Sequence, residues 1–225
     1  MGAEVPEPYL NDKALEYNFT NEGGAFGTWR LSKNIMGLWL VQECKRTWAH
    51  LGEELSYDEI TRLASEANPF LAVIDPDDKS FLHPGDMPER IQNYCANTNQ
   101  AVPQTKGAII RVALEGIALK YRWVLERLEE LIGKRLDPIH VIGGGTKNGL
   151  LNQFTADATC RPVISGPVEA TAIGNILMQA MGLKHLGSLA EARDIVRTSF
   201  TPEVYEPKQT KDWDEAYSRF QKVMK

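Results

Sequence analysis

The feature that most constrains the fold is an alternation of short apolar segments and helical patterns in the second half of the chain. The pattern predicts four elements: a strand at 139–142, a helix at about 148–159, a strand at 162–165 and a helix at about 168–181. Alternation at this spacing predicts parallel strands that share a sheet and are joined by crossover helices. Two further helices, near 188–198 and 208–223, are expected to close the chain.

The first half predicts one β-hairpin and several helices. Residues 14–34 are rich in aromatic and β-prone side chains, and the glycines at 23, 24 and 27 interrupt them, as in a hairpin. The other elements expected are helices at 34–50, 57–67, 87–99 and 104–132, a strand at 70–74 and a turn at 75–78. Because no repeat or linker divides the chain, we expect one α/β domain over 1–225.

Composition excludes several classes of protein. The 225 residues are 43% hydrophobic and 24% charged, as in globular proteins, and a net charge of −5 without a basic cluster argues against nucleic acid. No apolar run approaches the roughly 20 residues that cross a bilayer, and the start lacks a signal peptide, so we expect no membrane partner and a cytoplasmic location. Cys44, Cys95 and Cys160 are widely spaced, which favours reduced thiols over a zinc site or disulfides.

Three consecutive glycines, Gly143, Gly144 and Gly145, stand where the predicted strand ends and the next helix begins. Each costs roughly 0.5–1 kcal/mol relative to alanine, but glycines here let a ligand approach the backbone and leave amides facing an anion. The motif is neither a P-loop nor the dinucleotide fingerprint, since Asn148 stands where that fingerprint needs a third glycine. Phosphate is the best candidate ligand, and a tight turn without ligand is the alternative.

Asn148 falls at the start of the next helix. Its side chain suits a helix N-cap, and its amide could equally contact a nucleotide base or ribose. Farther on, the small residues Ala170, Ala172 and Gly174 either leave room beside the glycines or allow close helix packing. Both alternatives stay open for each feature.

Three stretches, 20–43, 140–157 and 161–176, together resemble the FGGY family of carbohydrate kinases, and the sequence "KNIMGLWLVQE" indicates its rhamnose branch. The resemblance covers nearly the whole chain. It implies a ribonuclease H-like, actin-like ATPase fold, with a mixed sheet and flanking helices. Kinases of this family have two domains and bind sugar and ATP in the cleft between them.

The resemblance also implies roles for single residues. Asn34 falls on the family's sugar-contacting asparagine, Gln42 on a nucleotide-contacting glutamine, and Gly143, Gly144 and Gly145 on the nucleotide-binding glycines. An asparagine at a helix start suits sugar hydroxyls, although an N-cap is the simpler alternative. Since the pattern places Asn34 and Gln42 on one helix, that helix is expected to contact both substrates across roughly 12 Å.

The implied activity is transfer of the γ-phosphate of ATP, with Mg²⁺, to the 1-hydroxyl of L-rhamnulose. In the family, the catalytic aspartate and a phosphate-contacting threonine lie ahead of the position of Met1, in or next to an amino-terminal sugar-binding domain that this chain lacks. We therefore expect a carboxyl-terminal, nucleotide-binding domain with no catalytic residue or metal ligand of its own, inactive alone. The alternatives are a kinase domain for another ketose and a non-catalytic nucleotide-binding module.

Overall fold

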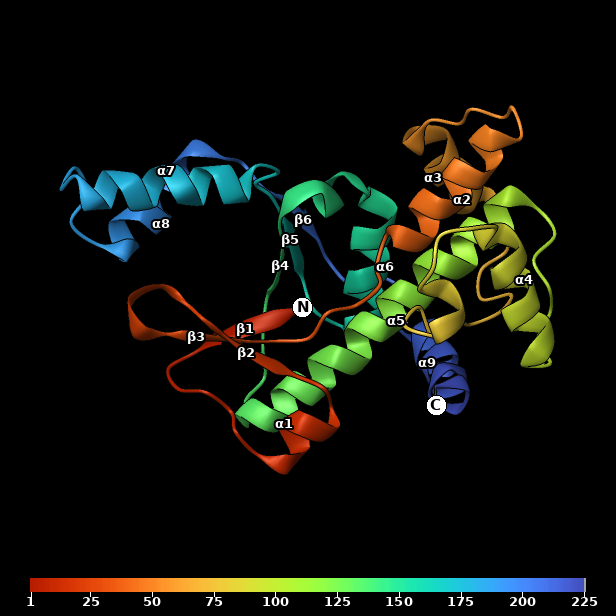
Figure 1. Ribbon diagram of the computed structural model, residues 1–225, viewed down its shortest axis with the longest axis horizontal. Helices are drawn as coiled ribbons and strands as arrows, with labels where there is room; N and C mark the ends of the chain where they lie inside the picture. Colours follow the sequence, from red (N-terminus) through yellow and green to blue (C-terminus); the bar gives the residue numbers. More distant parts are fainter. Residues whose placement is uncertain (225) are drawn as a thin grey trace.

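The computed structural model describes residues 1–224 and has a mixed α/β architecture with two three-stranded sheets (Figure 1). The first sheet is antiparallel, in the order β1 (Gly2–Val5), β3 (Trp29–Ser32), β2 (Thr20–Gly23). The second is mixed, with β4 (Ile139–Val141) parallel to β5 (Val163–Ser165) and β5 antiparallel to β6 (Glu203–Tyr205). The predicted hairpin and the predicted parallel pair are confirmed, whereas β1 and β6 were not expected.

The helices flank these sheets. The α-helices are α1 (Asp12–Glu16), α2 (Trp39–His50), α3 (Tyr57–Glu66), α4 (Met87–Asn97), α5 (Lys106–Ile132), α6 (Gly149–Thr159), α7 (Ala170–Gly182), α8 (Leu189–Ser199) and α9 (Lys211–Val223). Short 3-10 helices are η1 (Ala25–Gly27), η2 (Lys79–Phe81) and η3 (Gly143–Lys147). Local signals explain several boundaries: Ser56 and Glu59 form a capping box on α3, and Gly133 ends α5 at a φ of 76°.

The helix predicted from Asn34 is wrong at its start, because α2 begins at Trp39. Residues 33–36 have no regular secondary structure, and Gly37 has a left-handed φ of 56°. The amide of Met36 donates to Oδ1 of Asp77 at 2.8 Å, which an amide within the helix interior could not do while keeping its own helical bond. The apolar periodicity of the sequence therefore extends to residues before Trp39, where the backbone is not yet helical.

The strand predicted at 70–74 is also wrong, although the segment is largely buried. Side chains replace the missing sheet partners: the Phe70 amide donates to Glu115 Oε2 at 2.9 Å, and the Gln100 side-chain amide accepts from Val73 N and donates to Val73 O at 2.9 and 2.8 Å. The segment passes α5 at Gly116, where an added Cβ would lie 2.7 Å from Ile74 O. An apolar run can thus be buried without pairing in a sheet.

Two hydrophobic clusters hold the molecule together, and α5 contributes to both. The larger cluster includes Leu114 and Ile117 of α5 with side chains from α2, α3, α4, α6 and α9. The smaller includes Val124 and Leu128, farther along α5, with side chains from β1 and β3 such as Leu31. In Figure 1, α5 runs diagonally between the first sheet and the helices on the right.

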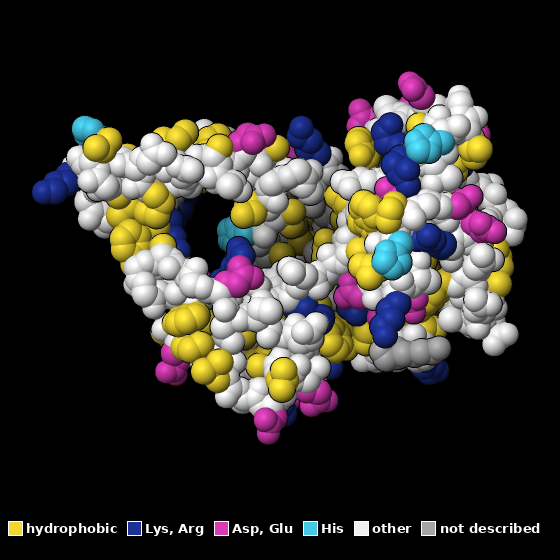
Figure 2. Space-filling model, viewed as in Figure 1, with side chains coloured by type: hydrophobic (Ala, Val, Ile, Leu, Met, Phe, Trp, Pro, Cys, Tyr) yellow, Lys and Arg dark blue, Asp and Glu magenta, His cyan; other side chains and the backbone are white. Residues whose placement is uncertain are grey.

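Helices α7 and α8 extend away from this body as an arm (Figure 1). No residue of α7 is buried. An ion pair joins the arm to the first sheet, with Arg193 Nη2 2.7 Å from Glu4 Oε2. Figure 2 shows an opening between the arm and the rest of the molecule, bordered in part by hydrophobic side chains.

None of the helices within residues 1–224 is both long enough and apolar enough to cross a bilayer.

Candidate functional site

The three consecutive glycines lie at the carboxyl end of β4, in the tight turn η3 that leads into α6. Gly143 has a φ of 77°, a conformation that favours glycine. Its amide donates to Pro167 O at 3.3 Å, and its carbonyl accepts from the Thr146 hydroxyl at 2.7 Å. The conformation of Gly143 is therefore explained by the turn itself.

The next two glycines have no such explanation within the chain. An added Cβ at Gly144 would meet nothing within 4 Å, and one at Gly145 would meet only Val141 Cγ1, at 3.9 Å. The first amides of a helix have no acceptor within the helix, and no acceptor outside η3 is present for these two among residues 1–224. The backbone at 144–145 is thus open to a ligand from outside and carries free donors.

Asn148 caps α6, because its Oδ1 accepts from the Leu151 amide at 2.9 Å. The N-cap alternative is therefore present in the structure. Its side-chain NH₂ has no hydrogen-bond partner in the described part of the chain, so a donor remains for a ligand.

Buried polar side chains that were not predicted hold the turn in place. Asn152 Nδ2 donates to Thr146 O at 3.0 Å, and the Ser165 hydroxyl donates to the same carbonyl at 3.2 Å. All three residues are buried. Asn152 could have been predicted from the sequence, because it is a polar residue one turn after Asn148 on a mostly apolar helix. These contacts fix η3 against β5, so the open amides belong to a rigid turn.

The start of α2 lies opposite this turn, across a cavity of about 270 Å³. Leu38, which precedes α2, lines it together with Gly145, and Gly2 of β1 and Tyr121 of α5 complete part of its wall. Segments far apart in the sequence thus meet at the glycine turn. Neither Asn34 nor Gln42 lines this cavity in the described part of the chain.

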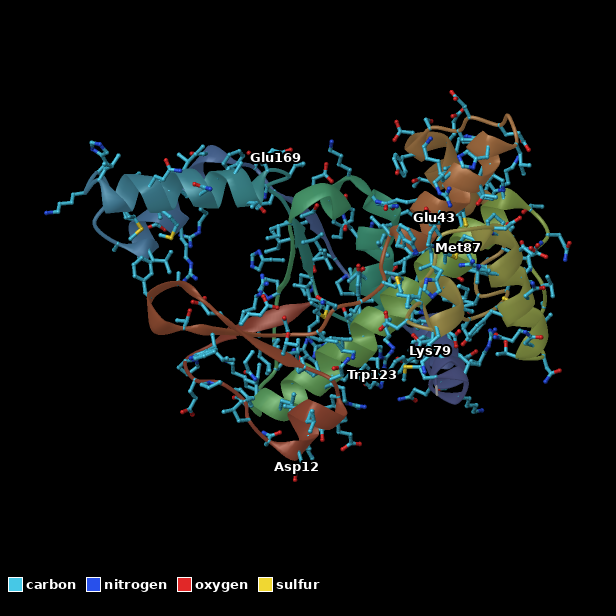
Figure 3. All side chains as sticks on the ribbon, viewed as in Figure 1. Asp12, Glu43, Lys79, Met87, Trp123 and Glu169 are labelled. Atoms are coloured by element: carbon cyan, nitrogen blue, oxygen red, sulfur yellow. The ribbon has the colours of Figure 1, made fainter. Side chains whose placement is uncertain are left out.

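A larger cavity, of about 600 Å³, lies on the α7 side of the turn. It is lined by Thr146 and Lys147 of η3, by Glu169 at the start of α7, and by Glu203 and Tyr205 of β6. Glu169 is labelled in Figure 3. The Tyr205 hydroxyl donates to Glu203 Oε2 at 2.5 Å, and this hydrogen bond is the main cause of a raised pKa for Tyr205. Lys147 therefore provides positive charge beside a wall that carries two carboxylates.

Asn34 and Gln42 are both exposed but lie on different segments. Gln42 is in the first turns of α2, whereas Asn34 precedes that helix in the irregular segment 33–36. One helix therefore does not carry both side chains, and the N-cap alternative for Asn34 is wrong, since Leu38 is the N-cap residue of α2. The Asn34 side chain makes no hydrogen bond within residues 1–224, which leaves its donor and acceptor available.

No group of three His, Cys, Asp or Glu side chains within residues 1–224 has a spacing suited to a metal ion.

Comparison with known proteins gives consistent results. The sequence model for the carboxyl-terminal domain of the FGGY family of carbohydrate kinases matches residues 1–183. Rhamnulokinase of Bacteroides thetaiotaomicron is 43% identical over 225 residues, which are 100% of this chain and 46% of that protein. Rhamnulokinase of Bacillus subtilis is 40% identical over 92% of this chain and 42% of its own length. The chain thus spans less than half the length of these curated relatives.

Solved structures share the fold. The ligand-bound xylulose kinase from Lactobacillus acidophilus superposes with a TM-score of 0.62 at 14% identity, covering 99% of this chain and 42% of that one. Plasmodium falciparum glycerol kinase with ADP gives 0.60 at 18% identity, covering 87% and 38%. The expected fold class, an actin-like ATPase domain with a mixed sheet and flanking helices, is confirmed.

Proposed function

This chain belongs to the FGGY family of carbohydrate kinases, and from that membership we propose that it is the nucleotide-binding part of a rhamnulokinase. Its complete enzyme transfers the γ-phosphate of ATP to the 1-hydroxyl of L-rhamnulose. The observation that carries this proposal is 43% identity to a rhamnulokinase along the whole chain. Since the chain spans less than half of such relatives, the activity belongs to a longer protein that also supplies a sugar-binding domain.

The glycine turn is the proposed phosphate site. Among residues 1–224, the amides of Gly144 and Gly145 have no acceptor outside η3, and no neighbouring atom blocks the approach of a ligand to the Cβ side of either glycine. A hydrogen bond from such an amide to a charged phosphate oxygen contributes about 1.5–3 kcal/mol. One or two of these bonds outweigh the conformational cost of the glycines when nucleotide is bound.

The remaining contacts are assigned by chemistry and by family motif. Asn148 offers its free NH₂ group to the base or ribose of ATP or ADP, and Gln42 is the second nucleotide contact, from α2. Asn34 is the sugar contact, because it is exposed and can both donate and accept. The aspartate that activates the sugar hydroxyl belongs to the part of the kinase outside these residues.

Mg²⁺ fits this scheme as an ion that arrives with the nucleotide. Mg²⁺ is usually held by one or two carboxylates, several waters and substrate phosphates rather than by a protein cage. The described residues offer no such cage, but Glu169 and Glu203 border the cavity beside the glycine turn. When bound, Mg²⁺ would neutralise charge on the phosphates.

Substitution of Gly144 tests the phosphate site. In the full-length kinase, Gly144→Val would place a branched side chain where the backbone must approach phosphate, and calorimetric affinity for ADP should fall at least about tenfold, or 1.4 kcal/mol. The matched control is Gly23→Val in β2, where an added Cβ also meets nothing within 4 Å. If folded Gly144→Val bound ADP as tightly as the control, the glycine turn would be removed from the site.

The isolated chain tests the division of labour. It should bind nucleotide weakly and fail to phosphorylate L-rhamnulose, because one wall of a cleft cannot align the acceptor hydroxyl with the γ-phosphate. Loss of a general base alone removes roughly 10²–10⁴ in rate. A coupled assay for ADP release, with saturating ATP, Mg²⁺ and L-rhamnulose, checks this. Sugar-dependent turnover near 1 s⁻¹, typical of kinases, would place the base within these 225 residues.

A further inference from the structure

Beneath the segment that carries Asn34 lies a cluster of three charged side chains, Asp75, Asp77 and Lys120. Lys120 Nζ lies 2.9 and 3.1 Å from the two carboxylate oxygens of Asp75 and 3.2 Å from Asp77 Oδ2. Lys120, in α5, and Asp75 are buried, and the side chain of Asp77 is 24% exposed. The ammonium group thus holds two carboxylates of one turn together.

Asp75 also shapes the turn that presents Asp77. Asp75 Oδ1 accepts from the Asp77 amide at 3.0 Å, and Asp75 O accepts from the Asp78 amide at 3.1 Å. One carboxylate oxygen of Asp77 therefore faces Lys120, while the other, Oδ1, accepts from the Met36 amide at 2.8 Å. Met36 is two residues beyond Asn34, so the cluster grips one end of the Asn34 segment.

The other end of the segment is held at Lys33. The Lys33 amide donates to Met1 O, and the backbone nitrogen of Met1 donates to Lys33 O, both at 2.9 Å. The Lys33 ammonium donates to Tyr17 O at 3.0 Å and lies 5.9 Å from the ring centre of Trp123, which is labelled on α5 in Figure 3. Lys120 lies 5.2 Å from the same ring. The exposed Asn34 stands between two fixed points, and both are tied to α5.

Stability alone is a poor account of this cluster. A buried ion pair loses so much hydration that apolar residues of similar volume often serve equally well. Its geometry, in contrast, is specific: Asp77 has one oxygen for Lys120 and one for the backbone of the Asn34 segment.

We infer that Asp77, held by Lys120 and Asp75, is a positioning residue that orients the Asn34 segment for sugar. This inference rests on the proposed sugar contact of Asn34. Asp77 itself does not touch the sugar. Its effect is on the orientation of the Asn34 amide, so it should change sugar recognition and leave nucleotide recognition unchanged.

Steady-state kinetics of the full-length kinase test the inference. Asp77→Ala removes the acceptor of the Met36 amide and should raise KM for L-rhamnulose about tenfold, the effect of one charged hydrogen bond. KM for ATP should change less than about twofold, because Asp77 acts only on the Asn34 segment. General damage to the fold would instead change the KM values for both substrates. Asp77→Asn keeps an oxygen for Met36 and should recover most of the sugar affinity. The matched control is Asp78→Ala, because Asp78 accepts from Ser80 instead of from the Asn34 segment.

A parallel variant, Asn34→Ala, distinguishes the positioning role of Asp77 from the proposed sugar contact of Asn34. If Asn34→Ala raises KM for sugar but Asp77→Ala does not, the positioning role is refuted and the sugar contact stands. If Asn34→Ala leaves KM for sugar unchanged, both are refuted. An equal rise in both KM values for Asp77→Ala would also refute the positioning role. Should Asp77→Ala fail to fold, Asp77→Ser replaces it, since its shorter side chain cannot reach the Met36 amide, and the same outcomes apply.

Discussion

Gly116, in the middle of α5, allows the backbone of residues 70–74 to pass directly over the helix. A Cβ added there would lie 2.7 Å from Ile74 O and 2.8 Å from Ile74 Cγ1. Ile74 cannot move away easily, because it is fully buried and because the backbone amides of Phe70 and Val73, in the same segment, donate to the side chains of Glu115 and Gln100. The change Gly116→Ala should therefore force α5 and this segment apart.

The expected magnitude follows from two opposing effects. Overpacking of a rigid core site costs about 1–3 kcal/mol, and the upper end applies because the obstacle is backbone. Alanine in a helix interior recovers about 1 kcal/mol relative to glycine. The free energy of unfolding should thus fall by about 2 kcal/mol, which lowers Tm by about 4–8 °C in a chain of this size.

Thermal unfolding followed by circular dichroism measures this, and Gly174→Ala is the control. Gly174 also lies inside a helix, α7, but an added Cβ would meet nothing within 4 Å. That variant should gain about 0.5–1 kcal/mol from helix propensity alone. If Gly116→Ala were as stable as Gly174→Ala, the close approach of Ile74 to α5 would be refuted.

Two further predictions concern ionisable groups. Burial raises the pKa of Glu115 to about 7 despite its ion pair with Arg111, so the folded state holds a proton that the unfolded state releases above about 4.5. The free energy of unfolding should therefore fall by up to about 3 kcal/mol as pH rises from 4.5 to 7, and Glu115→Gln should flatten this dependence in urea titrations; an unchanged slope would contradict the assignment. Cys160 is exposed, whereas Cys44 and Cys95 are buried and burial raises both thiol pKa values, that of Cys95 to about 11. One thiol per chain should react with Ellman's reagent in the native state and three after denaturation, and fast native reaction of a second thiol would argue against this core.

Local signals in the sequence predicted the elements whose ends are set by neighbouring residues. Gly133 ends α5 as expected, Asn148 caps α6, and Gly23 lies at the end of a hairpin strand. The glycine turn was placed correctly between β4 and α6, although its 3-10 conformation was not predicted. In each case the structure depends on residues within one or two turns of chain.

The predictions that were wrong concern segments whose backbone conformation depends on residues far away in the sequence. The segment 70–74 is stabilised by Gln100 and Glu115, far along the chain, and these contacts replace a strand. The segment at Asn34 is not helical, and its Met36 amide bonds to Asp77 rather than to a carbonyl within a helix. Periodicity reports which side chains are buried, but it carries no information about such long-range partners. The cluster at Lys120 was missed for the same reason.

The position of α5 in both hydrophobic clusters has a consequence for how the molecule comes apart. Each cluster packs on a different stretch of the same 27-residue helix. Loss of one cluster therefore removes part of the packing that stabilises that helix. Melting of the first sheet and melting of the helical part are therefore coupled through a shared element, and the body should unfold in one cooperative step. The arm of α7 and α8, which buries little, stands outside this coupling. The amide hydrogens of the arm should exchange with solvent by local opening, whereas those of α5 should exchange only when the whole body unfolds.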